Sequence, residues 1–226
     1  MKIKFGAIVT DGRGKIGGHV ASKNRGGAYL RTKVTPVNPR TSYQLAVRSR
    51  LAAIAQTWKT LTQAERTSFN AAVKDFARTN IFGDLKTPSG FNLYQRLNLN
   101  LGKVGSAFIT AAPSPQEVLA LTSLSVAAGY GAGDIVLTFS PAIDAGSKVV
   151  IGATPMLSPG KSFVKSEYRD IMVADNLDTS PLTITSEYVA KFGAAVAGQK
   201  VFFQMRAVDT TRGQAGQTIE ASAIVS

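Results

Sequence analysis

The residues with the clearest potential for chemistry lie close to the start of the chain. Residues 12–18 read Gly-Arg-Gly-Lys-Ile-Gly-Gly, and they are flanked by Asp11 and His19. A phosphate-binding P-loop has the pattern Gly-x4-Gly-Lys-Ser/Thr between a strand and a helix. In this chain Ile16 follows Lys15 in place of Ser or Thr, and no helical periodicity follows the glycines. We therefore interpret the segment as part of a glycine-rich cationic arm and not as a nucleotide-binding loop.

Basic side chains recur along this arm. Arginine and lysine form charge-assisted hydrogen bonds with anionic groups, and glycine lets one backbone approach another closely. The arm has little apolar content of its own, so we expect it to become ordered against an acidic partner or a neighbouring subunit. The residues predicted to contact such a partner, or a nucleic acid, are Arg13, Lys15, Lys23, Arg25, Arg31, Lys33 and Arg40.

Catalytic side chains are scarce. The chain has no cysteine and one histidine, so it lacks a thiol nucleophile, a disulfide framework and a multi-histidine metal site. A Ser-His-Asp triad would need His19 as its base, and only Asp11 lies near it in the sequence. Asp175 and Asp178 lack the alternating spacing of a calcium loop, and turn chemistry explains aspartates at such places. We predict that the protein is not an enzyme and binds no metal or cofactor.

The charge of the chain is unevenly distributed. The 226 residues carry a formal net charge of +12. Residues 1–50 contain eleven Lys/Arg and one acid, residues 51–110 contain seven and three, and residues 111–226 contain eight and ten. The change of sign falls at Ala111-Ala112-Pro113-Ser114-Pro115, a composition typical of a linker. No apolar run reaches the roughly 18–20 residues that a membrane span needs, so no membrane contact is predicted.

The segment after the arm has the signals of three short helices. Thr41 and Ser42 together give the N-cap signal of the first helix. Thr62 and Glu65 form a capping box that predicts a second helix over residues 63–78. Ser89 caps a third helix, and we expect Gly102 to cap its C-terminal end.

These helices are predicted to share one core. In the first helix the apolar residues recur every three or four positions, at Val47, Leu51, Ile54, Trp58 and Leu61. The aromatic residues of the segment also lie on apolar helical stripes, so we interpret them as core and not as a stacking platform. They are Trp58, Phe69, Phe76, Phe91 and Tyr94.

Beyond residue 116 the apolar periodicity changes from helical to alternating. Seven runs separated by turn residues are predicted to be strands, over residues 121–127, 134–140, 148–153, 168–174, 181–186, 200–209 and 218–225. A short helix or wide turn is expected within residues 187–197. Seven short strands in this length are the signature of an immunoglobulin-like sandwich.

The predicted fold is therefore α+β and multidomain. It has a basic extended arm with a short β-hairpin (residues 1–41), a small three-helix bundle (residues 42–112) and a seven-stranded immunoglobulin-like β-sandwich (residues 113–226).

Four motifs stand in order within residues 12–102. They are Gly14-Lys15-Ile16-Gly17-Gly18, Arg31-Thr32-Lys33-Val34-Thr35-Pro36-Val37-Asn38-Pro39-Arg40-Thr41-Ser42, Trp58-Lys59-x-Leu61-Thr62-x-x-Glu65-Arg66 and Ser89-Gly90-Phe91-Asn92-Leu93-Tyr94. Together they resemble a family of largely uncharacterised proteins encoded in tailed-bacteriophage and prophage genomes. Residues 197–225 resemble the last two strands of fibronectin type III domains. The first resemblance implies a virion setting and no particular activity, and the second implies an adhesive or decorative module.

Two functions agree with these features. The first is a structural component of a bacteriophage virion, made in the bacterial cytoplasm: a capsid decoration, minor capsid or head–tail connector protein. Its arm would bind neighbouring subunits, with many copies in a symmetric assembly. The alternative is a DNA-binding protein without sequence specificity that uses the same arm against phosphate groups. The two are compatible if the arm faces packaged DNA.

Overall fold

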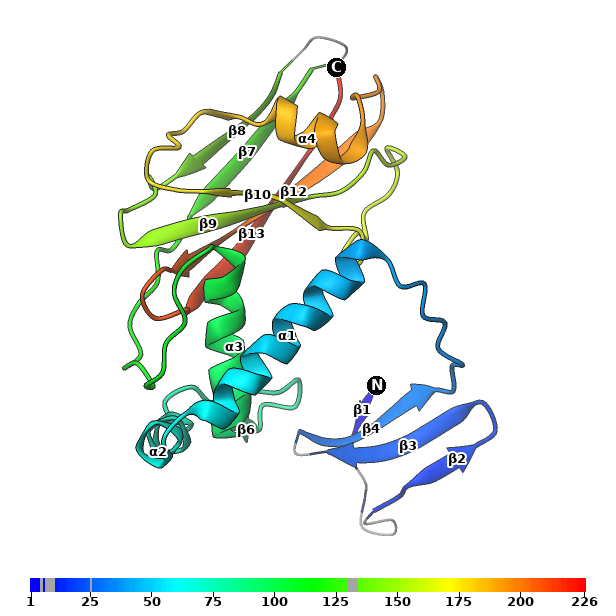
Figure 1. Ribbon diagram of the computed structural model, residues 1–226. Coiled ribbons are helices and arrows are strands. Elements are labelled where there is room, and N and C mark those ends of the chain that lie inside the picture. Colours follow the sequence, from blue (N-terminus) through cyan, green and yellow to red (C-terminus); the bar gives the residue numbers. More distant parts are fainter. Residues whose placement is uncertain (5, 7–10, 25, 130–133) are drawn as a thin grey trace.

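The structure, a computed structural model, describes residues 1–4, 6, 11–24, 26–129 and 134–226. In this part of the chain it contains four α-helices and four antiparallel sheets, which confirms the α+β class. Figure 1 shows the N-terminal sheet at one end, helices in the middle and the C-terminal sheets at the other end.

The N-terminal segment forms a four-stranded antiparallel sheet, with strand order β1-β4-β3-β2. Its strands are β1 (Lys2–Ile3), β2 (Gly14–Ile16), β3 (His19–Asn24) and β4 (Gly27–Thr32). Gly17 has a φ of +54° in the turn between β2 and β3, a conformation that glycine adopts without strain. The expectation of an extended arm with a short hairpin is therefore corrected, because the hairpin is extended on its other side by β4 and β1. Residues 33–40 run without regular structure, and all of them are exposed.

Each helix of the helical segment begins at the residue after its predicted N-cap. The helices are α1 (Ser42–Thr60), α2 (Gln63–Ala72) and α3 (Gly90–Lys103), and a hairpin of β5 (Arg78–Thr79) and β6 (Leu85–Lys86) precedes α3. The hydroxyl groups of Thr41, Thr62 and Ser89 each accept a hydrogen bond from the first turn of the helix that follows. The complete capping box of Thr62 and Glu65 is present. All three predicted N-caps are thus confirmed.

Two predicted helix ends are wrong. α2 ends at Ala72 and not at residue 78, because the chain continues in turns closed by hydrogen bonds from Asp75 to Ala72 and from Ala77 to Lys74. α3 includes Gly102 and is capped by Val104, whose N–H donates to the carbonyl groups of Asn100 and Leu101.

The core of this segment joins the three helices. Ile54 of α1, Phe69 of α2 and Tyr94 of α3 are buried in one cluster. The centres of the Trp58 and Tyr94 rings are 5.1 Å apart. The first half of the predicted α1 stripe is different. Val47 is 44% exposed and Leu51 is 42% exposed. Only the C-terminal half of α1 therefore packs into this core.

The C-terminal segment contains seven strands, one in each predicted run, among its described residues. They are β7 (Ser123–Ala128), β8 (Ile135–Ser140), β9 (Ser147–Ala153), β10 (Arg169–Ala174), β11 (Leu182–Thr183), β12 (Lys200–Asp209) and β13 (Ala215–Ile224). They form two sheets, with strand orders β10-β9-β12-β13 and β11-β8-β7. One apolar core receives residues from both, including Leu137 of β8 and Phe203 of β12. The expected short helix is present as α4 (Thr185–Phe192).

The last turn of α3 is attached to the C-terminal sheets by several polar contacts. The Asn100 side-chain amide donates to the Gly213 carbonyl over 2.8 Å, and Lys103 forms an ion pair with Asp170 at 2.7 Å. Val104, which follows α3, packs against Val150 and Val208. The helical and C-terminal segments are thus in direct contact and are not joined by the chain alone.

Candidate cationic interface

The register of the N-terminal sheet decides which basic side chains lie together. Lys15 of β2 is opposite Val20, which is opposite Arg31 of β4. In the next row Tyr29 is opposite Ser22 on one side and Lys2 on the other. Residues that are directly opposite in an antiparallel ladder point to the same side of the sheet, as do residues two apart on one strand. Lys2, Lys15, Tyr29 and Arg31 therefore share one face, which we term the cationic face.

The charge of this face is not neutralised locally. Lys2, Lys15 and Arg31 are exposed, and Tyr29 is half-buried. Among the described residues, no carboxylate lies within ion-pair distance of these three cations. Adjacent strands are about 4.8 Å apart, so Arg31 and Lys15, which are separated by β3, lie about 10 Å apart across the sheet, and Lys2 is on the strand next to Arg31. Such spacing favours contact with several anionic groups in a row.

The other predicted contact residues lie elsewhere. Lys23 belongs to the opposite face of the sheet and lies 3.5 Å from the Asp11 carboxylate. Arg13 and Lys33 are exposed and lie just outside β2 and β4. Arg40 is at the far end of the extended segment, where it has a φ of +50°. The prediction for Arg25 falls outside the described residues.

The opposite face of the sheet, which also holds Lys23 and His19, carries several apolar residues and is only partly covered. It carries Ile3, Ile16, Ala21 and Leu30, by the same register argument. Ala21 is the one buried residue among the described residues of 1–40, and Ile16 is 72% exposed. The sheet therefore has no substantial core of its own.

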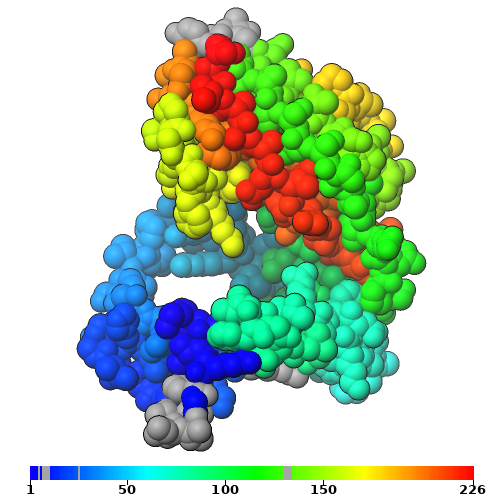
Figure 2. All heavy atoms as spheres, turned by 180° about the vertical axis from the view of Figure 1, so that it is seen from behind, coloured from blue at the N-terminus to red at the C-terminus, as the bar shows by residue number. Residues whose placement is uncertain are grey.

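The sheet is attached to the helical segment through Lys4. The Lys4 ammonium group lies 3.0 Å from the Asp84 carboxylate and 5.2 Å from the centre of the Phe82 ring. The hydrogen bond from Lys4, together with one from Asn80, holds the pKa of Asp84 below its ordinary value. In Figure 2 the N-terminal sheet (blue) lies beside the region of β5 and β6 (teal).

Sequence reasoning did not select Lys2 and Lys4 as contact residues. Lys2 joins the cationic face only because β1 pairs with β4, some 27 residues further along the chain. Asp84 is 80 residues from Lys4. The one available signal was the run Lys2-Ile3-Lys4, which alternates as a strand does, but it does not name its partner strand.

The residues considered for nucleotide binding and catalysis, Lys15 and His19, lie in the strands of one hairpin. Gly14 to Asn24 form the β2–β3 hairpin, so Lys15 lies in a strand and no helix follows the glycine-rich loop. His19 is exposed on β3, opposite Ile16 and Thr32. In the part of the chain that the structure describes, no three His, Cys, Asp or Glu residues gather as metal ligands would. No described helix is both long enough and apolar enough to cross a membrane.

No protein-family model matches this chain, and no curated protein sequence matches it either. The geometry of the cationic face and of the surfaces around it is therefore the basis for inferring a function.

Proposed function

We propose that the protein is a non-catalytic structural component of a bacteriophage virion that binds neighbouring subunits through its N-terminal segment. A capsid decoration, a minor capsid or a head–tail connector protein would each fit this description. The observation that carries the proposal is the open N-terminal sheet. Both of its faces are largely uncovered, and it is joined to α1 by the exposed residues 33–40 (Figure 1). A sheet with so little core of its own gains most of its burial from a partner.

A second surface supports an assembly role. Tyr43, Val47 and Leu51 recur every four residues on one side of α1 and are all more than 40% exposed. Beside them lies a cavity of about 480 Å³ between α1 and β10, which is also lined by Val150, Ile171 and Met172. Contiguous exposed apolar surface on a monomer is characteristic of protein–protein contact sites. Burial in an assembly would remove it from water.

The finer architecture is part of the same proposal. Residues 42–112 would be a three-helix bundle, supported by the core shared among α1, α2 and α3. Residues 113–226 would be an immunoglobulin- or fibronectin-III-like sandwich, supported by the core shared between the two C-terminal sheets. A boundary near residue 113 is supported by two hydrogen bonds, because the Ala112 N–H donates to Ser68 in the helical segment and the Gln116 N–H donates to Gln214 in the C-terminal segment.

The test is the composition of particles of the phage whose genome encodes this chain. Mass spectrometry of purified particles should find the protein in many copies, and its absence from them would refute the proposal. The double variant Lys15→Glu/Arg31→Glu should reduce incorporation at least tenfold, because two charges of the cationic face are reversed. The matched control is Lys165→Glu/Lys191→Glu, which makes the same change of net charge at two other exposed lysines. Equal incorporation of both variants would exclude the cationic face as the contact.

The alternative function is DNA binding without sequence specificity through the same face. The observation that favours it is Tyr29, an aromatic ring on the cationic face beside Arg31 and opposite Lys2. Aromatic rings among cations form the stacking and phosphate contacts of many proteins that bind nucleic acid.

Salt dependence tests this alternative. The logarithm of the binding constant for duplex DNA, measured by fluorescence anisotropy, should fall linearly with the logarithm of salt concentration. The Lys15→Glu/Arg31→Glu variant should reduce the slope by about 0.9 for each lost phosphate contact, whereas the Lys165→Glu/Lys191→Glu control should keep it. A slope unaffected by the first variant would argue against DNA binding by this face.

A further inference from the structure

Three cations converge where the β5–β6 hairpin meets α3. Arg78 of β5 and Lys86 of β6 are directly opposite each other in the ladder. Arg96 of α3 is half-buried, and its guanidinium carbon lies 5.5 Å from the centre of the Phe76 ring. We term Arg78, Lys86 and Arg96 the cation cluster. It lies outside the cationic face and was not selected from the sequence.

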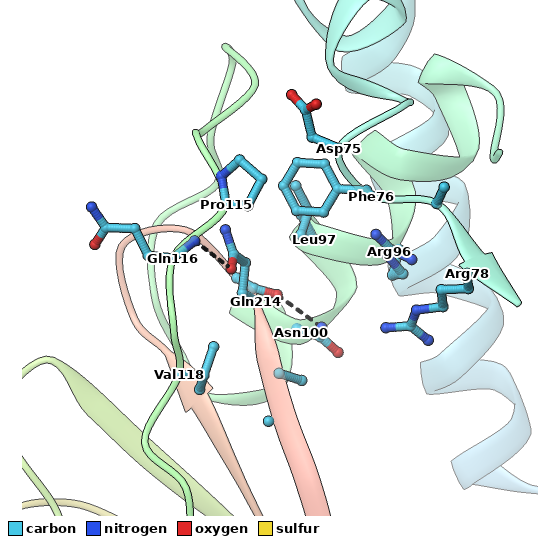
Figure 3. A pocket seen from close by; sticks show the side chains of 14 residues that line it. Asp75, Phe76, Arg78, Arg96, Leu97, Asn100, Pro115, Gln116, Val118 and Gln214 are labelled. Atoms are coloured by element: carbon cyan, nitrogen blue, oxygen red, sulfur yellow. Dashed lines mark hydrogen bonds between the residues drawn. The ribbon is translucent and has the colours of Figure 1, made fainter. Parts of the chain in front are cut away.

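The cluster lines two cavities. One of about 250 Å³ is lined by all three cations together with Phe76, Thr87 and Asn92, among others. The other, of about 340 Å³, is lined by Arg78 and Arg96 and, on its far side, by Gln116 and Gln214. Figure 3 shows this second cavity, with the guanidinium groups of Arg78 and Arg96 on the same side of it. Arg78 and Arg96 therefore line both cavities, and their side chains can contact a ligand in either one.

The positive charge of the cluster has no close counter-charge. Among the described residues, no carboxylate lies within ion-pair distance of the three cations. Asp84 lies near enough to Lys86 for the lysine to lower its pKa, but the Asp84 carboxylate is bound by Lys4. Asp75 lines the larger cavity, and its carboxylate points away from both guanidinium groups, beyond the Phe76 ring (Figure 3).

This arrangement costs the folded state free energy. Like charges that are directly opposite in a ladder repel each other. Burial lowers the pKa of the Arg96 guanidinium, and the positive charge of Arg78 lowers it further. An anion seated between the three side chains would offset the repulsion between the cations and the cost of burying the Arg96 charge, so its binding should be favourable.

We propose that the cation cluster is a binding site for a phosphate group. Two guanidinium groups present planar forks of N–H donors that match phosphate oxygens, and Lys86 adds a point charge. Thr87 and Asn92 add neutral donors to the wall of the smaller cavity. Three positive charges exceed what one carboxylate neutralises, whereas a phosphate monoester carries close to two negative charges at neutral pH. This proposal does not depend on the assembly role.

Isothermal titration calorimetry with inorganic phosphate, at constant ionic strength, tests the site. The unmodified protein should bind phosphate, and Lys86→Gln and Arg78→Gln should each bind it at least tenfold more weakly. Arg78 is exposed, so its replacement leaves the helical core intact. The matched control is Lys191→Gln, an exposed lysine of α4, which should bind phosphate as the unmodified protein does.

A second probe identifies the source of the phosphate. A deoxythymidine trinucleotide is titrated with and without a 5′-phosphate. Tighter binding of the phosphorylated form, lost in Lys86→Gln, assigns the site to a phosphate monoester on a nucleotide. Binding of inorganic phosphate that depends on Lys86, with neither trinucleotide bound, assigns it to free phosphate. If no probe binds, or if Lys86→Gln and Arg78→Gln bind as Lys191→Gln does, the proposal is overturned.

Discussion

Asp209 is the most heavily hydrogen-bonded carboxylate among the described residues. Its Oδ1 accepts from the N–H groups of Thr211 and Arg212 over 2.7 and 2.8 Å, and from the Thr211 hydroxyl group. Its Oδ2 lies 3.1 Å from the Arg212 guanidinium group. Burial raises the pKa of Asp209, but these hydrogen bonds outweigh it and hold the pKa below its ordinary value of 3.8. The ionised form is thus preferred more strongly in the folded state than in the unfolded state.

This preference predicts a specific acid sensitivity. A depressed carboxyl pKa contributes stability above the unfolded value, and that stability is lost as the pH falls below 3.8 through the folded value. The free energy of unfolding, measured by urea denaturation across this range, should fall more steeply for the unmodified protein than for Asp209→Asn. Parallel curves would show that the hydrogen bonds of Asp209 do not favour its ionised form.

Single residues were predictable where their partners are local. Thr41, Thr62 and Ser89 were identified as N-caps because each bonds to a backbone N–H three residues away. Asn98 was not identified, although it is fully buried and its side chain exchanges hydrogen bonds with both backbone groups of Ile109. Its partner lies 11 residues away in an irregular segment, and no periodicity in the sequence points to such a contact.

The contact between α3 and the β12–β13 turn depends on Gly213. This residue has a φ of +69°, and a Cβ added to it would overlap the carbonyl group of Leu97 and the side chain of Leu101. We expect Gly213→Ala to lower the free energy of unfolding by about 1–3 kcal/mol more than its control does, because the contact must open. The control is Gly198→Ala, which has a φ of +75° and no atom near the added Cβ. Equal losses by chemical denaturation would mean that backbone strain alone matters.

Elements were predictable in type and less so in extent. The period of two predicted the positions of the seven C-terminal strands, but the strand expected over residues 181–186 is limited to β11, at residues 182–183, because α4 begins at Thr185. The stripe of α1 predicted a buried face along the helix, yet only Ile54 within α1 is fully buried. Periodicity shows which face is apolar, and it does not show how far the neighbouring elements reach along that face. The pairing of β1 with β4 was missed because alternation along one strand does not identify the strand with which it pairs.

Proteolysis should show how the parts of the chain differ in stability. Residues 33–40 are exposed and irregular, and they include the trypsin sites Lys33 and Arg40. Lys15 and Arg31 lie in paired strands. Limited trypsin digestion of the isolated protein should therefore cut first at Lys33 or Arg40, and mass spectrometry should find a fragment that begins at residue 34 or 41. A first cut within residues 113–226 would contradict this order.

The uneven charge along the chain shows where cations are concentrated, but it does not show which of them lie together. Residues 1–50 are strongly basic. Strand register then separates Lys23 from Lys15 and Arg31, and it adds Lys2. Arg78, Lys86 and Arg96 lie in a part of the chain with a smaller excess of cations, and only the β5–β6 pairing brings two of them together.

The extended segment 33–40 also determines how two contacts made by one chain would combine. Eight residues span at most about 26–29 Å, and Pro36 and Pro39 restrict the backbone further. Once the N-terminal sheet has bound a partner, the short segment therefore holds the helices near that partner, at an effective concentration of about millimolar. Two weak contacts would then act with an avidity about 10²–10⁴ times that of either one. Lengthening this tether would weaken attachment without removing a single contact.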